Sequence, residues 1–173
     1  MELSAWLAER EERVAASWLA HLRSRSGKPS EEEEVLLEYF LVRLVSLLPT
    51  CFGERKEAGE EAWHQATYLF GSVALQRALS AGEVVEEFGI LREILLKMLL
   101  EDPAAGWENR VFRRDLLGLN RLLDQGVVRA SVAYVDDLFF AHLQGSGIPE
   151  GLTPELEEET RRQLDGLMTE LKG

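Results

Sequence analysis

The chain has 173 residues, 46% of them hydrophobic and 29% charged, which suits one globular domain or one domain with a terminal extension. Its 31 acidic and 19 basic residues give a net charge of −12, which disfavours nucleic-acid binding because no basic cluster offsets it. The single cysteine, Cys51, excludes an intrachain disulfide and a cysteine metal cage.

The N-terminal sequence lacks the basic region and apolar run of a signal peptide. No stretch approaches the roughly 18 uninterrupted apolar residues of a membrane span. We therefore expect a soluble, cytoplasmic protein with no membrane insertion.

The first half of the chain has the apolar periodicity of amphipathic helices. The segment 2–25 is expected to be one helix, ended by the sequence SGKPS. Ser30 and Glu33 form a capping box that opens a second helix, which stops at Pro49. A third helix is predicted over 57–79.

The second half continues this pattern. Ser80 and Glu83 form another capping box, which opens a helix over 81–101. After a Gly/Pro-rich linker, Thr153 and Pro154 supply the N-cap and first-turn proline of a last helix.

The segment 108–143 is apolar at helical spacing throughout. As one helix it would be roughly 50 Å long, so we expect it to bend or break near Gly118 or Gly126, or to extend past its neighbours. Its predicted apolar stripe consists of Val111, Leu116, Leu119, Leu123, Val127, Val132, Val135 and Phe139.

No alternating strand pattern competes with these helices, so the sequence predicts an all-α protein of five to six helices. A helical bundle and a globin-like packing both fit this list. The expected organisation is a helical domain over 1–143, a linker over 144–152 and a C-terminal helix over 153–173.

Catalytic and metal-binding patterns are scarce. Glu61 and His64 have the Glu-x-x-His spacing of a carboxylate-bridged metal site, but a second copy is missing. Nucleophile elbows and phosphate-binding loops are missing as well. We expect no catalytic residues, no metal and no enzyme activity.

The alternative function is haem or small-molecule binding by a globin-like fold. His64 or His142 would then be the haem ligand. Phosphotransfer by His64 is a third hypothesis, although the sequence HQATY departs from the pattern that usually follows a phosphotransfer histidine.

The stretch FGSVALQRALSAGEVVEEFGILREILLKML resembles the N-terminal sensor domain of RsbR-type stressosome proteins (the RsbRD N-terminal family) and of some sensor histidine kinases. In that family an Arg-containing helix end and a small-residue break precede a helix of the form V-x-E-[FY]-x-x-L-R. The matching residues are Arg77, Gly82, Val84, Val85, Glu87, Phe88, Leu91 and Arg92.

The resemblance implies a globin-like helical input domain that usually lacks haem, dimerises and signals through a C-terminal helix. Such domains act in signal transduction with a kinase, STAS or phosphatase-type partner. Here no output domain follows, so we expect either a stand-alone regulator or a fragment of a larger protein.

Two surfaces are candidates for a homodimer. The last helix has Leu164, Leu167 and Leu171 on one side, which allows either a short coiled coil between protomers or packing onto its own bundle. The long segment 108–143 offers a second surface if it outreaches its neighbours.

Capping and core packing explain most of the resembling segment but leave Arg77, Glu87 and Arg92 unexplained. Glu87 and Arg92 are five residues apart, so they do not form a simple surface pair along one helix. We predict that at least one of the three forms a partly buried ion pair with another helix.

Overall fold

The computed structural model describes residues 2–25, 30–105, 110–147 and 151–172, and these form seven α-helices, two short 3-10 helices and no strand. The all-α prediction is confirmed, and the fold is a helical bundle. The helices are α1 (Leu3–Ala8), α2 (Glu11–Arg23), α3 (Glu31–Leu47), α4 (Lys56–Gln76), α5 (Ala81–Glu101), α6 (Arg110–Leu143) and α7 (Pro154–Glu170), with η1 (Thr50–Phe52) and η2 (Pro103–Ala105) between them.

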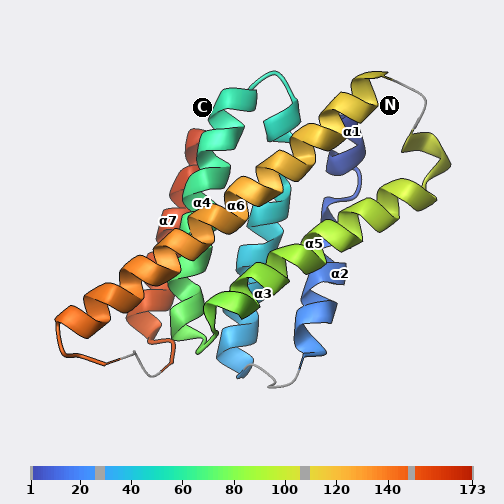
Figure 1. Cartoon of the computed structure of the whole chain (residues 1–173). Coiled ribbons are helices and arrows are strands. Elements are labelled where there is room, and N and C mark those ends of the chain that lie inside the picture. The colour runs from blue at the N-terminus through green and yellow to red at the C-terminus, as the bar shows by residue number, and fades with distance from the viewer. Residues whose placement is uncertain (1, 26–29, 106–109, 148–150, 173) are drawn as a thin grey trace.

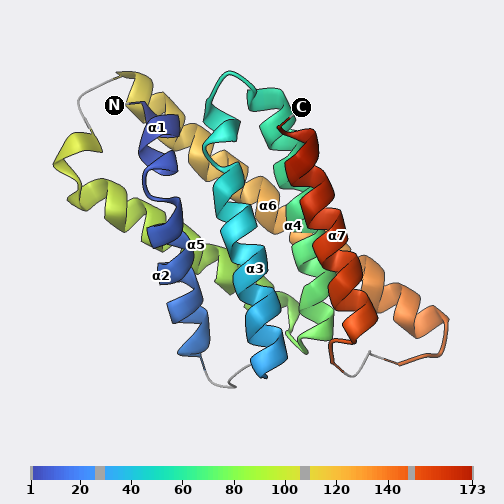
Figure 2. The ribbon, with the colours of Figure 1, turned by 180° about the vertical axis from the view of Figure 1, so that it is seen from behind.

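The helices lie in two layers (Figure 1). α5 and α6 run diagonally side by side across one face, and α2, α3 and α4 stand behind them. Seen from behind, α7 lies along α3 and α4 at the edge of the second layer (Figure 2).

Local chemistry sets several helix starts as predicted. The Ser30–Glu33 and Ser80–Glu83 capping boxes both form, so α3 and α5 begin where the sequence indicates. The Thr153 side chain accepts a hydrogen bond from the backbone of Leu156 and caps α7.

The prediction of one helix over 2–25 is wrong, because the chain breaks between α1 and α2. Arg10 leaves helical geometry there, with φ −123°. Its guanidinium lies 2.6 Å from the Asp102 carboxylate, which also accepts a hydrogen bond from the Trp6 indole at 2.9 Å. The carboxylate at the end of α5 therefore holds the break in place, and the helix count exceeds the predicted five to six.

The core is built on an aromatic cluster shared by both layers. Phe70 of α4 is at its centre, with ring centroids 5.3 Å from Phe40, 5.4 Å from Phe88 and 6.0 Å from Trp18. The pairs with Phe40 and Phe88 are edge-to-face and the pair with Trp18 is stacked, and both arrangements stabilise a core beyond simple burial. The aromatic side chains of this cluster fill the interior of the bundle.

α6 is one unbroken helix, so neither Gly118 nor Gly126 breaks it. Both glycines instead allow close packing: a Cβ at Gly126 would lie 3.0 Å from Trp63, and one at Gly118 would lie 3.2 Å from Phe52. The backbones of α4 and α6 cross at Gly71, where a Cβ would lie 2.0 Å from the Ala130 carbonyl oxygen.

One described segment, Glu31–Phe52, is long and apolar enough to cross a membrane by length and composition. It contains α3, whose apolar residues face the aromatic core. A central core helix has the same composition as a membrane span, and half of this segment is buried in the bundle.

Candidate functional site

The resembling segment brings Arg77 and Glu87 together in a buried ion pair. Arg77 ends α4 and donates two hydrogen bonds to the Glu87 carboxylate, at 2.9 and 2.7 Å. Their side chains are only 9% and 2% exposed. The prediction of a partly buried ion pair between helices is confirmed.

Other helices converge on this pair. The Trp18 indole of α2 donates to the Glu87 carbonyl at 2.8 Å, so α2 contacts α5 at the same residue. Beyond Arg77 the chain turns through Ala78, whose φ is 55°, and Tyr134 of α6 donates to the Leu79 carbonyl at 2.8 Å. The pair therefore lies where α2, α4, α5 and α6 meet.

The remaining motif residues have structural roles. Phe88 and Leu91 are core residues, and Gly82 is exposed in the first turn of α5. Arg92 forms a surface ion pair with Asp124 of α6. The motif therefore fixes how α5 sits on α4 and α6, and it does not assemble a reaction centre.

The two candidate histidines lie outside the aromatic core. The His64 ring is half-buried and lies 3.1 Å from the Gln125 side chain. His142 is exposed in the last turn of α6. The Glu61 carboxylate accepts from Gln65 at 2.8 Å. Among the described residues, no three His, Cys, Asp or Glu side chains gather closely enough to hold a metal ion.

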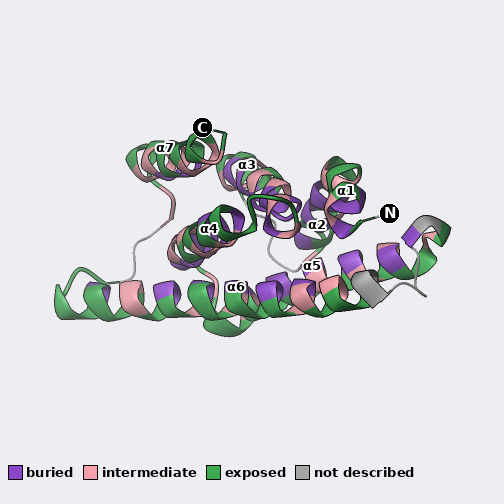
Figure 3. Cartoon of the chain, turned by 90° about the horizontal axis from the view of Figure 1, so that it is seen from above, coloured by how far each residue is buried: buried purple, intermediate pink, exposed green. Residues whose placement is uncertain are grey.

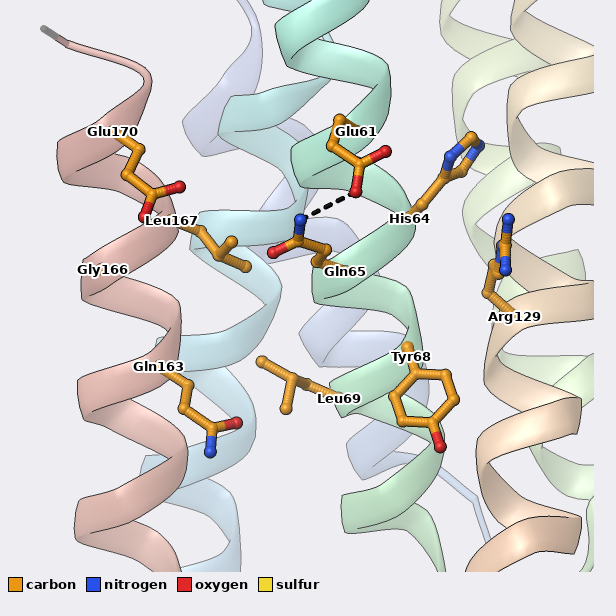
Figure 4. Close-up of a pocket in the computed structure, with 10 residues that line it drawn as sticks. All are labelled: Glu61, His64, Gln65, Tyr68, Leu69, Arg129, Gln163, Gly166, Leu167 and Glu170. Atoms are coloured by element: carbon orange, nitrogen blue, oxygen red, sulfur yellow. Dashed lines mark hydrogen bonds between the residues drawn. The ribbon is translucent and has the colours of Figure 1, made fainter.

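His64 and Glu61 line a surface trough of about 540 Å³ between α4, α6 and α7. Figure 4 shows α4 between Arg129 of α6 on one side and Glu170 and Leu167 of α7 on the other. The trough is therefore broad, carries both signs of charge and has one wall made by α7. Its residues are Glu61, His64, Gln65, Tyr68, Leu69, Arg129, Gln163, Gly166, Leu167 and Glu170.

Cys51 is fully buried in η1, where its thiol donates to the Leu47 carbonyl at 3.3 Å. Burial raises the pKa of the Cys51 thiol to about 12. The thiolate that nucleophilic chemistry requires is therefore not formed near neutral pH.

The three leucines of the last helix pack onto the same chain. Leu164 is buried, and Leu167 and Leu171 are half-buried against the core. Of the two arrangements left open by the sequence, α7 adopts the one that folds back on the bundle. Its leucine side does not remain free to form a coiled coil between protomers.

α6 carries a second apolar face that we call the outer stripe. Ala130 and Ala133 are completely buried, whereas Val132 is 46% exposed two residues after Ala130, which is about 200° around the helix. The outer stripe consists of Leu117, Val128, Val132, Val135, Phe139 and Leu143.

The single stripe predicted for 108–143 is therefore wrong. It mixes residues of the inner face, such as Leu119 and Leu123, with Val132, Val135 and Phe139 of the outer stripe. The side chain of Val111 lies outside those that the structure describes. Apolar residues on two opposite sides of one helix were the available signal that the segment has two apolar faces.

The chain matches no family model, no curated protein and no solved structure. The resemblance to stressosome sensor domains therefore rests on the residues of the motif.

Proposed function

We propose that this chain is a non-enzymatic regulatory protein of bacterial signal transduction that acts as a cytoplasmic homodimer. Its partner would be a signalling protein of the kinase, STAS or phosphatase type, as the resemblance at residues 77–92 implies. The outer stripe of α6 is the observation that supports this function best, because it is an exposed apolar face on a helix whose opposite face is packed into the core.

The outer stripe extends along most of α6. Figure 3 shows exposed residues along the outward side of this helix and buried residues along the side that faces the second layer. Its members follow Val128 at intervals of four, three, four and four residues, the spacing at which two helices pack together. Arg121 and Asp124 lie on the same side of α6 between Leu117 and Val128, so two charged side chains separate Leu117 from the continuous part of the outer stripe.

The stripe offers enough apolar surface for association. Its six side chains are between 46% and 64% exposed, so burying each one contributes roughly 1 kcal/mol. Two protomers together would gain about 12 kcal/mol, against an association cost of about 4–15 kcal/mol. This balance supports a reversible dimer whose stability responds to small changes in the position of α6.

Contacts on the two flanks of the outer stripe connect this surface with the rest of the bundle. Ion pairing of Asp124 with Arg92 joins α6 to α5, and contact of Gln125 with His64 joins it to α4. A shift of α5 or α4 would therefore move the outer stripe. Packed helices favour discrete alternative positions, which is the property that a signalling domain needs.

Sedimentation velocity of Val135→Asp tests the dimer. We expect the wild-type chain to dimerise at micromolar concentration and Val135→Asp to weaken the dimer at least about 30-fold, because a carboxylate would be buried without a partner. Val35→Asp is the matched control, since Val35 of α3 is 53% exposed and Val135 is 56% exposed. A wild-type chain that is monomeric at about 200 μM, roughly two hundred times a micromolar Kd, would refute the dimer.

A further inference from the structure

The contact between α7 and α3 is centred on Tyr39. The Arg43 and Arg161 guanidinium groups lie 3.2 and 4.3 Å from the centre of its ring, one from α3 and the other from α7. The Tyr39 hydroxyl donates to the Asp165 carboxylate at 2.5 Å, and the Arg43 Nε donates to the same oxygen at 2.9 Å. Asp165 of α7 therefore fits a site on α3 that is built from one phenol and one guanidinium.

Apolar contacts complete the docking surface. Leu164 is 1% exposed, and Leu167, Met168 and Leu171 pack half-buried against the core. Arg55 donates to the Leu171 carbonyl at the far end of the helix. The occupant of this surface is thus an acidic amphipathic helix with apolar residues at positions i, i+3, i+4 and i+7 and an aspartate at i+1.

α7 is held less firmly than the helices of the bundle. Its buried residues are Thr160 and Leu164, whereas α5 buries seven residues from Val84 to Leu99. The segment joining it to α6 includes Gly145, Gly147 and Gly151, all with positive φ. Glycine adopts these conformations at little cost, so these three positions of the connection are not strained.

We propose that the surface of α3 and α4 beneath α7, which we call the α7 groove, is a docking site for an acidic amphipathic helix of the partner protein. α7 occupies the groove in cis and is displaced when the partner helix binds. The inference deepens the proposed function, since it names the surface and the chemistry by which a regulatory protein would recognise its partner.

The charge and apolar pattern of α7 define the partner helix. It carries a leucine that enters the position of Leu164, and an aspartate or glutamate that accepts from Tyr39 and Arg43. A short tether gives α7 an effective concentration of about 1 mM at its own groove. A helix in trans therefore binds well only when its affinity is high or when the docking of α7 is weakened.

Fluorescence anisotropy with a labelled peptide of residues 153–172 tests whether a helix in trans can replace α7 in the groove. The peptide is titrated with the full-length chain, wild-type and Leu164→Ala, since the substitution weakens the cis helix and leaves the groove intact. We expect Leu164→Ala to bind the peptide at least about ten-fold more tightly than wild-type, because a buried leucine contributes strongly to docking. Glu158→Ala, an exposed position of α7, is the control and should behave as wild-type.

A second pair of variants locates the site. In the Leu164→Ala chain, Tyr39→Phe removes the hydroxyl that donates a hydrogen bond to Asp165. It should lower the affinity for the labelled peptide several-fold. Tyr68→Phe makes the same change on α4 at a hydroxyl whose hydrogen-bond partner is Asp136 of α6, and it should have no effect.

Three results would overturn the proposal: no binding to Leu164→Ala at 100 μM peptide, about a tenth of the effective concentration; equal binding to wild-type and Leu164→Ala; or equal loss in Tyr39→Phe and Tyr68→Phe. The dimer is tested separately, by sedimentation velocity of the wild-type chain and Val135→Asp. If the chain is monomeric but the peptide still replaces α7 in the groove, the dimer is refuted and the docking proposal stands.

Discussion

Among the carboxylate–arginine contacts that join helices in this protein, two differ clearly in burial. Arg77 and Glu87 connect α4 to α5 with side chains 9% and 2% exposed. Arg43 and Asp165 connect α3 to α7 with side chains 26% and 55% exposed. The same two chemical groups therefore form a buried contact in the first case and a partly exposed contact in the second.

This difference separates a permanent contact from a reversible one. Removing one partner of a buried pair leaves an uncompensated charge away from water, which costs far more than the pair itself contributes. An exposed pair contributes about 0–1 kcal/mol, because water solvates both groups when they separate. The buried pair thus holds α5 firmly on α4, whereas the exposed pair adds little to the docking of α7 on α3.

The largest effect is expected at the buried pair. Arg77→Ala should lower the free energy of unfolding by about 3–5 kcal/mol, because the Glu87 carboxylate would remain buried without its two donors. Urea denaturation followed by circular dichroism measures the change. Arg92→Ala removes the exposed partner of Asp124 and should cost no more than about 1 kcal/mol. Equal losses in the two variants would contradict the distinction between buried and exposed pairs.

Two glycine substitutions extend the comparison to backbone packing. A Cβ at Gly71 would lie 2.0 Å from the Ala130 carbonyl oxygen, so Gly71→Ala must push α4 and α6 apart and should destabilise the protein by about 1–3 kcal/mol. A Cβ at Gly166 of α7 meets no atom within 4 Å. Gly166→Ala should therefore stabilise α7 by roughly 0.5–1 kcal/mol, through helix propensity alone.

Thermal unfolding measures the stability of both glycine variants, and hydrogen exchange of the α7 amides measures the local stability of α7. Protection of α7 should rise in Gly166→Ala, and the peptide in trans should bind that chain more weakly. A stabilising Gly71→Ala would show that α4 and α6 are not in contact at this crossing.

The sequence was sufficient where the determinants are local. Both capping boxes lie within four residues of the helix starts that they set, so Ser30 and Ser80 could be interpreted without tertiary information. The ion pair at Glu87 was also predictable, because a charged residue beside an apolar stripe needs a partner when the helix is buried.

The remaining features depend on distant residues. The break at Arg10 needs Asp102, which lies 92 positions along the chain. Periodicity places Leu123 and Val132 on opposite sides of α6, but which side faces the bundle depends on where α4 crosses the helix, so the sequence alone could not assign the inner face. The return of α7 to α3 depends on Tyr39 and Asp165, 126 positions apart.

The smallest effect concerns the pH dependence of α7 docking. The hydrogen bond from Tyr39 and the nearby Arg43 hold the pKa of the Asp165 carboxyl below its usual value. A carboxyl with a lowered pKa in the docked state stabilises docking above its undocked pKa, and this contribution disappears as the pH falls through the docked pKa. We therefore expect the protection of the α7 amides, taken relative to their intrinsic exchange rate at each pH, to fall on acidification below about pH 4.

Asp165→Asn isolates this contribution, because the amide keeps the shape of the side chain and does not titrate. Its docking should be weaker than wild-type at pH 7 by less than about 1 kcal/mol, as for an exposed pair, and the two chains should converge near pH 3. Glu83 has a lowered pKa in the capping box of α5 as well, so α5 is an internal reference for acid sensitivity. An acid response in α5 equal to that in α7, and unchanged by Asp165→Asn, would assign the effect to the whole bundle and not to the α7 groove.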